Sequence, residues 1–216
     1  MNIGILGSGM VGKTVGAALV KHGHTVMLGT RSAEKKDVVQ WVETTGGRSS
    51  AGTFEDAARF GEIHLLCTKG EATLNALQLA GTAHFKGKIV IDITNPLDFS
   101  RGMPPSLLPQ FANTNSLGEE VQKALPEARV VKTLNVVNCE VMVDPRKSGG
   151  DPTMFVCGND RAAKDGVSGI LRTFGWNDII DLGDITAARG TEMLLPIWVR
   201  LWMSTQNGLV AFKVVR

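Results

Sequence analysis

Residues 4–32 read GILGSGMVGKTVGAALVKHGHTVMLGTRS, and this stretch decides the fold. An apolar run over Asn2–Leu6 leads into Gly7-Ser8-Gly9-Met10-Val11-Gly12, which is a GxGxxG motif. Apolar residues then recur at helical spacing up to Gly23, and a second apolar run covers Thr25–Leu28. The order strand, turn, helix, strand predicts a dinucleotide-binding βαβ unit rather than a plain structural turn.

Each glycine of the motif has an expected physical role. Gly7 allows the tight turn, Gly9 lets the main chain approach a pyrophosphate, and Gly12 lets the helix pack closely on the strand. The pyrophosphate is expected at the first N–H groups of the helix, where the helix dipole is positive.

The end of the second strand indicates which dinucleotide binds. An NAD site usually has Asp or Glu about 20 residues after the glycines, to bind the ribose 2′-hydroxyl. This chain has no acidic residue between Gly12 and Glu34. Arg31 can instead pair with a 2′-phosphate, Thr30 and Ser32 can donate hydroxyl hydrogen bonds, and Lys35 adds positive charge. The sequence therefore predicts NADP rather than NAD.

Strands and helices alternate along the rest of the chain. Further strands are expected at Ile63–Cys67, Lys88–Ile93, Arg129–Leu134, Thr153–Cys157 and Asp178–Leu182. This alternation predicts an α/β fold with a doubly wound, parallel, Rossmann-type sheet. Ser32 is expected to cap the helix that carries Val38, and residues 96–109 are expected to form a loop. Because the pattern changes near Asn138, we predict an NADP-binding domain over residues 1–137 and a small C-terminal α/β domain over residues 138–216.

Composition narrows the function further. The 216 residues carry 23 Lys+Arg and 21 Asp+Glu without a basic block, so nucleic acid is not an expected partner. The chain shows no signal peptide and no apolar stretch long enough to cross a bilayer, so we expect a protein without membrane attachment. Three widely spaced cysteines favour a reducing cytoplasm over a disulfide framework, and no metal site is expected.

Several stretches together resemble one family. They are GILGSGMVGKTVGAALVKHGHTVMLGTRSAEK, GKIVIDITNPL, SLGEEVQKALPEARVVKTLNVVN, VCGNDRAAK and LGDITAARGTEMLLP, in order and over most of the chain. They are similar to the NADPH-dependent reductases of the deazaflavin coenzyme F420, a family related to the cytosolic domain of the STEAP metalloreductases. The resemblance implies a Rossmann domain and a small C-terminal domain that closes over the nicotinamide.

The resemblance also implies where NADP(H) is bound. Beside the glycine motif and the end of the second strand, it implies contacts from the end of the strand at Ile63–Cys67 and from two later asparagines. The implied residues are Ser8, Gly9, Met10, Val11, Thr30, Arg31, Lys35, Cys67, Thr68, Lys69, Asn95, Pro96 and Asn135. The chain departs from the family at Lys69-Gly70, where Pro-Trp is common, and over residues 132–135, where Phe is common. The electron acceptor, either coenzyme F420 or a flavin, therefore stays open.

The expected chemistry is direct hydride transfer, which requires little acid–base help. The chain has no Tyr, and all four His precede residue 85, so we name no catalytic acid. Asp92 and Asp98 are candidates for ribose contacts or turn roles, and Lys132 is expected to be solvated. The apolar face of the last helix is expected in the core or in a homodimer.

Two other functions are compatible with a glycine motif of this kind. An imine or β-hydroxyacid reductase usually has a longer, all-helical second domain, which residues 138–216 cannot supply. An NADPH-binding redox sensor without turnover remains the alternative to an enzyme.

Overall fold

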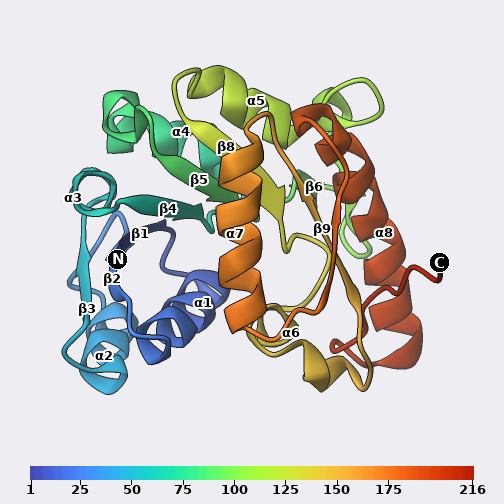
Figure 1. Cartoon of the computed structure of the whole chain (residues 1–216), viewed down its shortest axis with the longest axis horizontal. Coiled ribbons are helices and arrows are strands. Elements are labelled where there is room, and N and C mark those ends of the chain that lie inside the picture. Colours follow the sequence, from blue (N-terminus) through green and yellow to red (C-terminus); the bar gives the residue numbers. More distant parts are fainter.

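A single eight-stranded sheet runs through the computed structural model, which describes all residues from 1 to 216 (Figure 1). The spatial order of its strands is β10-β9-β8-β5-β4-β1-β2-β3. Neighbouring strands are parallel, except that β8 and β9 are antiparallel. The strands are β1 (Asn2–Leu6), β2 (Thr25–Gly29), β3 (Ser49–Gly52), β4 (Ile63–Leu66), β5 (Ile89–Asp92), β8 (Arg129–Thr133), β9 (Thr153–Cys157) and β10 (Asp178–Asp181).

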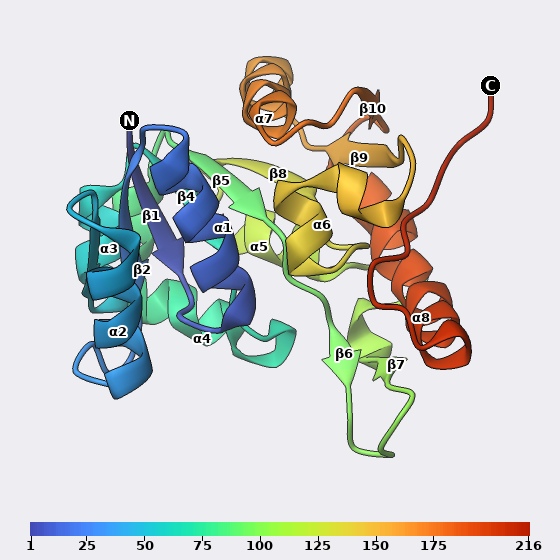
Figure 2. The ribbon, with the colours of Figure 1, turned by 90° about the horizontal axis from the view of Figure 1, so that it is seen from below.

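Helices cover both faces of the sheet (Figure 2). One apolar core contains Leu19 of α1, Trp41 of α2 and Leu171 of α7, and the core on the opposite face contains Leu77 of α4 and Val121 of α5. The helices are α1 (Met10–Lys21), α2 (Lys36–Thr45), α3 (Phe54–Phe60), α4 (Gly70–Ala80), α5 (Leu117–Ala124), α6 (Cys139–Val143), α7 (Arg161–Thr173) and α8 (Ala188–Thr205). The doubly wound α/β fold predicted from the sequence is therefore confirmed.

Local signals explain several element boundaries. The hydroxyl of Thr53 accepts the backbone N–H of Asp56, and the Asp56 carboxylate accepts the N–H of Thr53, which is a capping box at the start of α3. The predicted Ser32 cap is wrong, because α2 begins only at Lys36 and Lys35 is its N-cap. The Ser32 N–H instead approaches the Thr30 hydroxyl at 3.4 Å, and a turn at residues 33–34 precedes the helix.

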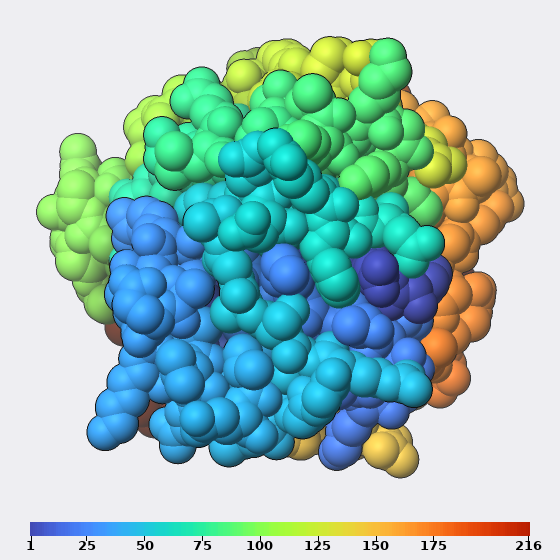
Figure 3. Space-filling model, turned by 90° about the vertical axis from the view of Figure 1, so that its left-hand side faces the viewer, coloured from blue at the N-terminus to red at the C-terminus, as the bar shows by residue number.

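Two strand features were absent from the sequence prediction, as was the short helix α6. The first is β3, a short edge strand of small residues that pairs with β2. Figure 3 views the molecule from this edge, where residues of α2, β3 and α3 form the surface. The second is an antiparallel hairpin of β6 (Leu97–Asp98) and β7 (Ser106–Leu107), inside the segment expected to be a plain loop. The hairpin projects from the sheet on the side of α8 (Figure 2).

The segment after residue 137 adds to the same sheet. Its strands β9 and β10 continue the sheet beyond β8, and Thr133 Oγ1 donates to the carbonyl of Phe155 at 2.7 Å across that junction. The division into a domain over residues 1–137 and a domain over residues 138–216 therefore remains a prediction. The sheet itself continues across this boundary.

Candidate functional site

The turn between β1 and α1 needs two of its three glycines for packing. Gly7 has a φ of +126°, and a Cβ built there would lie 2.6 Å from the carbonyl oxygen of Cys67. A Cβ on Gly12 would lie 2.0 Å from the carbonyl oxygen of Gly7. A Cβ on Gly9 would meet nothing within 4 Å, so the protein itself does not require glycine there. The space above Gly9 is open to a ligand.

The N-terminus of α1 opens into that space. Its N-cap is Gly9, which has no side chain to bond the first N–H groups, and no acidic residue occupies the first turn. These free donors and the helix dipole favour an anion at this position. The open space above Gly9 and the unbonded N–H groups of the first turn therefore suit a dinucleotide pyrophosphate.

The end of β2 lies beside the same space. The hydroxyl of Ser8 donates to that of Thr30 at 3.0 Å, which joins the glycine turn to this strand end. The side chains of Arg31 and Lys35 are exposed and form no ion pair with a carboxylate. These two cations are therefore free to bind a phosphate.

A cavity of about 410 Å³, called here the cationic cavity, joins these elements. Three bases and one acid are among its lining residues, so its formal charge is positive. They are Gly7, Ser8, Gly9, Thr30, Arg31, Lys35, Phe54, Cys67, Thr68, Lys69, Glu71, Ala72, Asn75 and Ala76.

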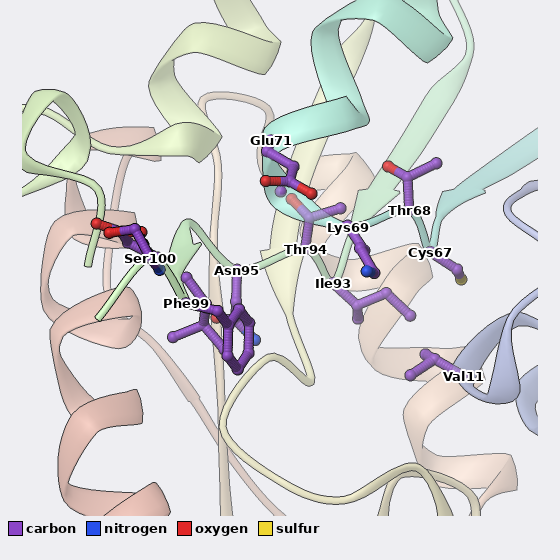
Figure 4. Close-up of a pocket in the computed structure, with 13 residues that line it drawn as sticks. Val11, Cys67, Thr68, Lys69, Glu71, Ile93, Thr94, Asn95, Phe99 and Ser100 are labelled. Atoms are coloured by element: carbon purple, nitrogen blue, oxygen red, sulfur yellow. Dashed lines mark hydrogen bonds between the residues drawn. The ribbon is translucent and has the colours of Figure 1, made fainter. Parts of the chain in front are cut away.

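A second cavity of about 600 Å³, called here the larger cavity, lies beside it and shares Cys67, Thr68, Lys69 and Glu71 (Figure 4). Its other lining residues come from α1, from the start of α4, from the end of β5 and from the hairpin. They are Val11, Gly70, Ile93, Thr94, Asn95, Leu97, Asp98, Phe99 and Ser100. The two cavities form one trough along the carboxyl ends of β1, β4 and β5, where ligands bind in open α/β sheets.

The structure brings most of the predicted contact residues to this trough. Five of them do not line either cavity: Met10, Gly12, Ser32, Pro96 and Asn135. Gly12 serves packing, and Asn135 lies buried behind Asn95, bonded to it side chain to side chain at 3.0 Å. The lining residues that the sequence did not indicate include Glu71 and Phe99. The signal that could have found Phe99 is its position just after the fifth strand, where a sheet of this type binds ligands.

Lys132 is not solvated as expected but fully buried. Its Nζ lies 3.0 Å from Asp92 and 2.8 Å from Glu192. Burial lowers the pKa of Lys132, but the two carboxylates outweigh this effect and raise it above its usual value. Asp92 therefore has a structural partner and does not line the trough.

No reactive thiol and no imidazole lines the trough. All three cysteines are free, and burial raises the pKa of Cys67, which keeps this cavity-lining thiol protonated. His64 is buried in β4 with its Nε2 3.0 Å from the Ala58 carbonyl. No cluster of side chains suited to a metal ion is present.

A doubly wound sheet with a glycine turn, a cationic strand end and a trough along its carboxyl edge defines a Rossmann-type nucleotide-binding protein. The profile of the family described as NADP oxidoreductase, coenzyme F420-dependent, matches residues 2–96. The F420-dependent NADP reductase of Methanocaldococcus jannaschii is 30% identical over 209 residues, which cover 93% of this chain and 92% of that protein. The chain belongs to this family of F420-dependent NADP oxidoreductases and is an NADP-dependent oxidoreductase.

Two further similarities agree with this assignment. A crystal structure from Arthrobacter sp. FB24, assigned as an F420-dependent NADP-reductase, superposes with a TM-score of 0.95 at 47% identity and full coverage of both chains. The rat metalloreductase STEAP3 is 28% identical over 204 residues, which cover 91% of this chain but only 37% of STEAP3. The resemblance inferred from the sequence motifs is confirmed, as is NADP(H) as the cofactor.

None of the helices has the length and apolar character that crossing a membrane requires.

Proposed function

We propose that the protein transfers a hydride directly between NADP(H) and a flavin-like or deazaflavin ring bound in the larger cavity. When bound, NADP(H) supplies the hydride at its nicotinamide ring. The observation that carries the proposal is the division of the trough into two joined cavities of different character. The cationic cavity suits phosphates, whereas the larger one has apolar surface from Val11, Ile93, Leu97 and Phe99.

The residues of the cationic cavity would bind the phosphates of the cofactor. The glycine turn and the N-terminus of α1 would take the pyrophosphate, and Arg31 with Lys35 would take the 2′-phosphate. The contacts predicted at residues 67–69, 95–96 and 135 belong to the same proposal. Of these, Asn135 would act through Asn95 rather than by touching the cofactor.

The larger cavity would hold two flat rings in contact. Its charged lining residues are one base, Lys69, and two acids, Glu71 and Asp98, so it does not favour a phosphate. Phe99 is 56% exposed at its wall, where an aromatic side chain can pack against a ring (Figure 4). Holding two reactants in place contributes up to about 7–11 kcal/mol, and no side chain needs to move a proton.

The test is NADPH oxidation by the purified protein in the presence of F420, FMN, FAD or riboflavin, with NADH as the control. Turnover with F420 alone is the result expected of a deazaflavin reductase, and turnover with ordinary flavins supports a flavin reductase. NADPH binding without turnover of any acceptor would contradict the proposal and favour a redox sensor.

We further propose that the protein works as a homodimer in the cytoplasm. Met193, Ile197, Leu201 and Trp202 form an apolar face on α8 that is 39–54% exposed. Ile197→Asp is expected to convert the dimer to a monomer in light scattering, and a wild-type monomer would contradict the dimer. Three free cysteines suit a reducing compartment.

A further inference from the structure

A buried polar cluster lies beside the larger cavity and connects it to α8. It consists of Asp92 at the end of β5, Lys132 in β8 and Glu192 in α8, all with side chains that are fully buried. Two carboxylates face one ammonium, which leaves one negative charge in excess. The Glu192 carboxylate accepts the N–H groups of Leu117 and Gly118 at 2.9 and 3.0 Å, so the first turn of α5 compensates this charge.

The cluster holds every polar group of Thr94, a residue that lines the larger cavity. The Thr94 N–H and hydroxyl both donate to Asp92 Oδ1, at 2.9 and 2.6 Å. Lys132 Nζ donates to the Thr94 carbonyl at 2.6 Å. Because both ends of this residue are bonded to charged groups, its backbone has one defined orientation at the cavity wall.

Asn95, the next residue in the cavity wall, is connected to α8 through Asn135. Asn95 Nδ2 donates to the Asn135 carbonyl at 2.8 Å, and Asn135 Nδ2 donates to Asn95 Oδ1 at 3.0 Å and to the Thr191 carbonyl at 3.1 Å. Thr191 directly precedes Glu192 in α8. No residue of α8 lines the cationic cavity or the larger one, so the helix can affect them only through such contacts.

We infer that Lys132 and Glu192 are positioning residues for the acceptor, because Lys132 bonds the Thr94 carbonyl in the wall of the larger cavity and Glu192 holds the Lys132 ammonium in place. This inference rests on the proposed function, which places the acceptor in that cavity. Stability alone does not account for the cluster, because a buried ion pair is often no more stabilising than apolar residues of similar volume. Its contacts reach the larger cavity and not the end of β2, where the 2′-phosphate would bind.

The test is the double variant Lys132→Met/Glu192→Gln, which removes one charge of each sign and keeps the net charge of the cluster. We expect kcat/KM for the acceptor to fall roughly 10- to 100-fold, as small displacements of a reactant do. The NADPH dissociation constant, measured by calorimetry, is expected to change far less, because the cationic cavity, which would bind the phosphates, contains no residue of the cluster. Amide hydrogens of residues 92–97 are expected to exchange faster.

The matched control is Lys164→Met. Lys164 is also nearly buried and donates to a carboxylate and a carbonyl, those of Asp181 and Gly183 at 2.8 and 2.9 Å, but it lies away from both cavities. An equal loss of acceptor kcat/KM in this control would show a general effect of destabilisation and overturn the inference. If the double variant does not fold, Glu192→Gln alone is measured in the same way.

The experiments distinguish a failure of the proposed hydride transfer from a failure of the positioning role of Lys132 and Glu192. If the wild-type protein reduces no acceptor, the proposed function fails, and the positioning role is then judged from exchange at residues 92–97. Unchanged exchange there would overturn it. If the wild type is active, unchanged kcat/KM in a variant with faster exchange would overturn the positioning role alone.

Discussion

The hydroxyl of Ser8 donates a hydrogen bond to the hydroxyl of Thr30 at 3.0 Å, and so ties the glycine turn to the end of β2. The same Thr30 oxygen receives the N–H of Ser32 at 3.4 Å. Thr30 is 93% buried in this arrangement. Arg31, which lies between Thr30 and Ser32 in the sequence, is exposed, lines the cationic cavity and has no carboxylate partner. The turn thus presents one unpaired guanidinium next to the proposed pyrophosphate position.

Arg31→Ala is therefore expected to weaken NADPH binding roughly 10- to 100-fold, the usual effect of losing a hydrogen bond to a charged group. NADH binding should change little, because NADH lacks the 2′-phosphate. Calorimetric titration of both nucleotides with both proteins measures this. An equal loss for the two nucleotides would contradict the assignment of Arg31 to the 2′-phosphate.

Gly9→Ala separates ligand binding from folding. The backbone φ of Gly9 is −76°, and the added Cβ meets no protein atom within 4 Å. The free energy of unfolding is expected to change by less than about 1 kcal/mol, because alanine restricts the unfolded chain but is a poorer N-cap than glycine. NADPH binding is expected to weaken strongly, since the methyl group occupies the space assigned to the pyrophosphate.

Gly12→Ala is the matched comparison. Its Cβ would lie 2.0 Å from the Gly7 carbonyl oxygen, so this variant is expected to lose roughly 1–3 kcal/mol of unfolding free energy. Urea denaturation of both variants measures the difference. A stable Gly9→Ala protein that still binds NADPH normally would contradict the assignment of the pyrophosphate to this turn.

Lys69→Met tests the charge at the junction of the two cavities. Lys69 lines both cavities and has no ion-pair partner. As an exposed cation it is expected to contribute about two- to fivefold to NADPH affinity, and its loss should reduce the salt dependence of binding. Lys36→Met, at an exposed lysine of α2 outside both cavities, serves as the control. Equal NADPH affinity of the two variants would show that Lys69 makes no contact with the cofactor.

His64 should make the stability of the fold depend on pH. Burial lowers its pKa from 6.5 to about 4, its Nδ1 has no partner, and Lys88 and His84 oppose protonation further. Between these pH values the unfolded chain binds a proton that the folded chain does not. Unfolding free energy is therefore expected to fall as pH decreases from 6.5 to 4, by roughly 3 kcal/mol from this residue.

His64→Gln removes that proton uptake while the carboxylates still titrate. Urea denaturation at pH 7 and pH 5 is expected to show a smaller loss of stability in the variant than in the wild type. An equal loss in both proteins would show that His64 is already accessible to protons in the folded state.

Local patterns made much of this structure predictable. The strands β1 and β9 have the predicted bounds because each is a short apolar run next to a clear turn or helix start. The NADP preference also follows from neighbouring residues at the end of β2. By contrast, Ser49–Gly52 contains no large apolar residue, so nothing in its composition marks it as the strand β3.

The buried cluster shows why the rest could not be predicted. Asp92, Lys132 and Glu192 are 40 and 60 residues apart, and a lone lysine at a strand end normally lies in solvent. Only the sheet order, which places β5 beside β8, brings the first two together. Phe99 differs, because it follows β5 closely in the sequence, and this position is the signal that could have placed it at the larger cavity.

The continuity of the sheet past β8 has a consequence for synthesis on the ribosome. A nascent chain that has emerged only to residue 137 exposes β8 as a free edge strand, because β9 has not yet left the ribosome. At that stage the first turn of α5 also lacks the Glu192 carboxylate that accepts its N–H groups. The nucleotide-binding half is thus expected to reach its final form only when α8 arrives, and until then it depends on protection against aggregation.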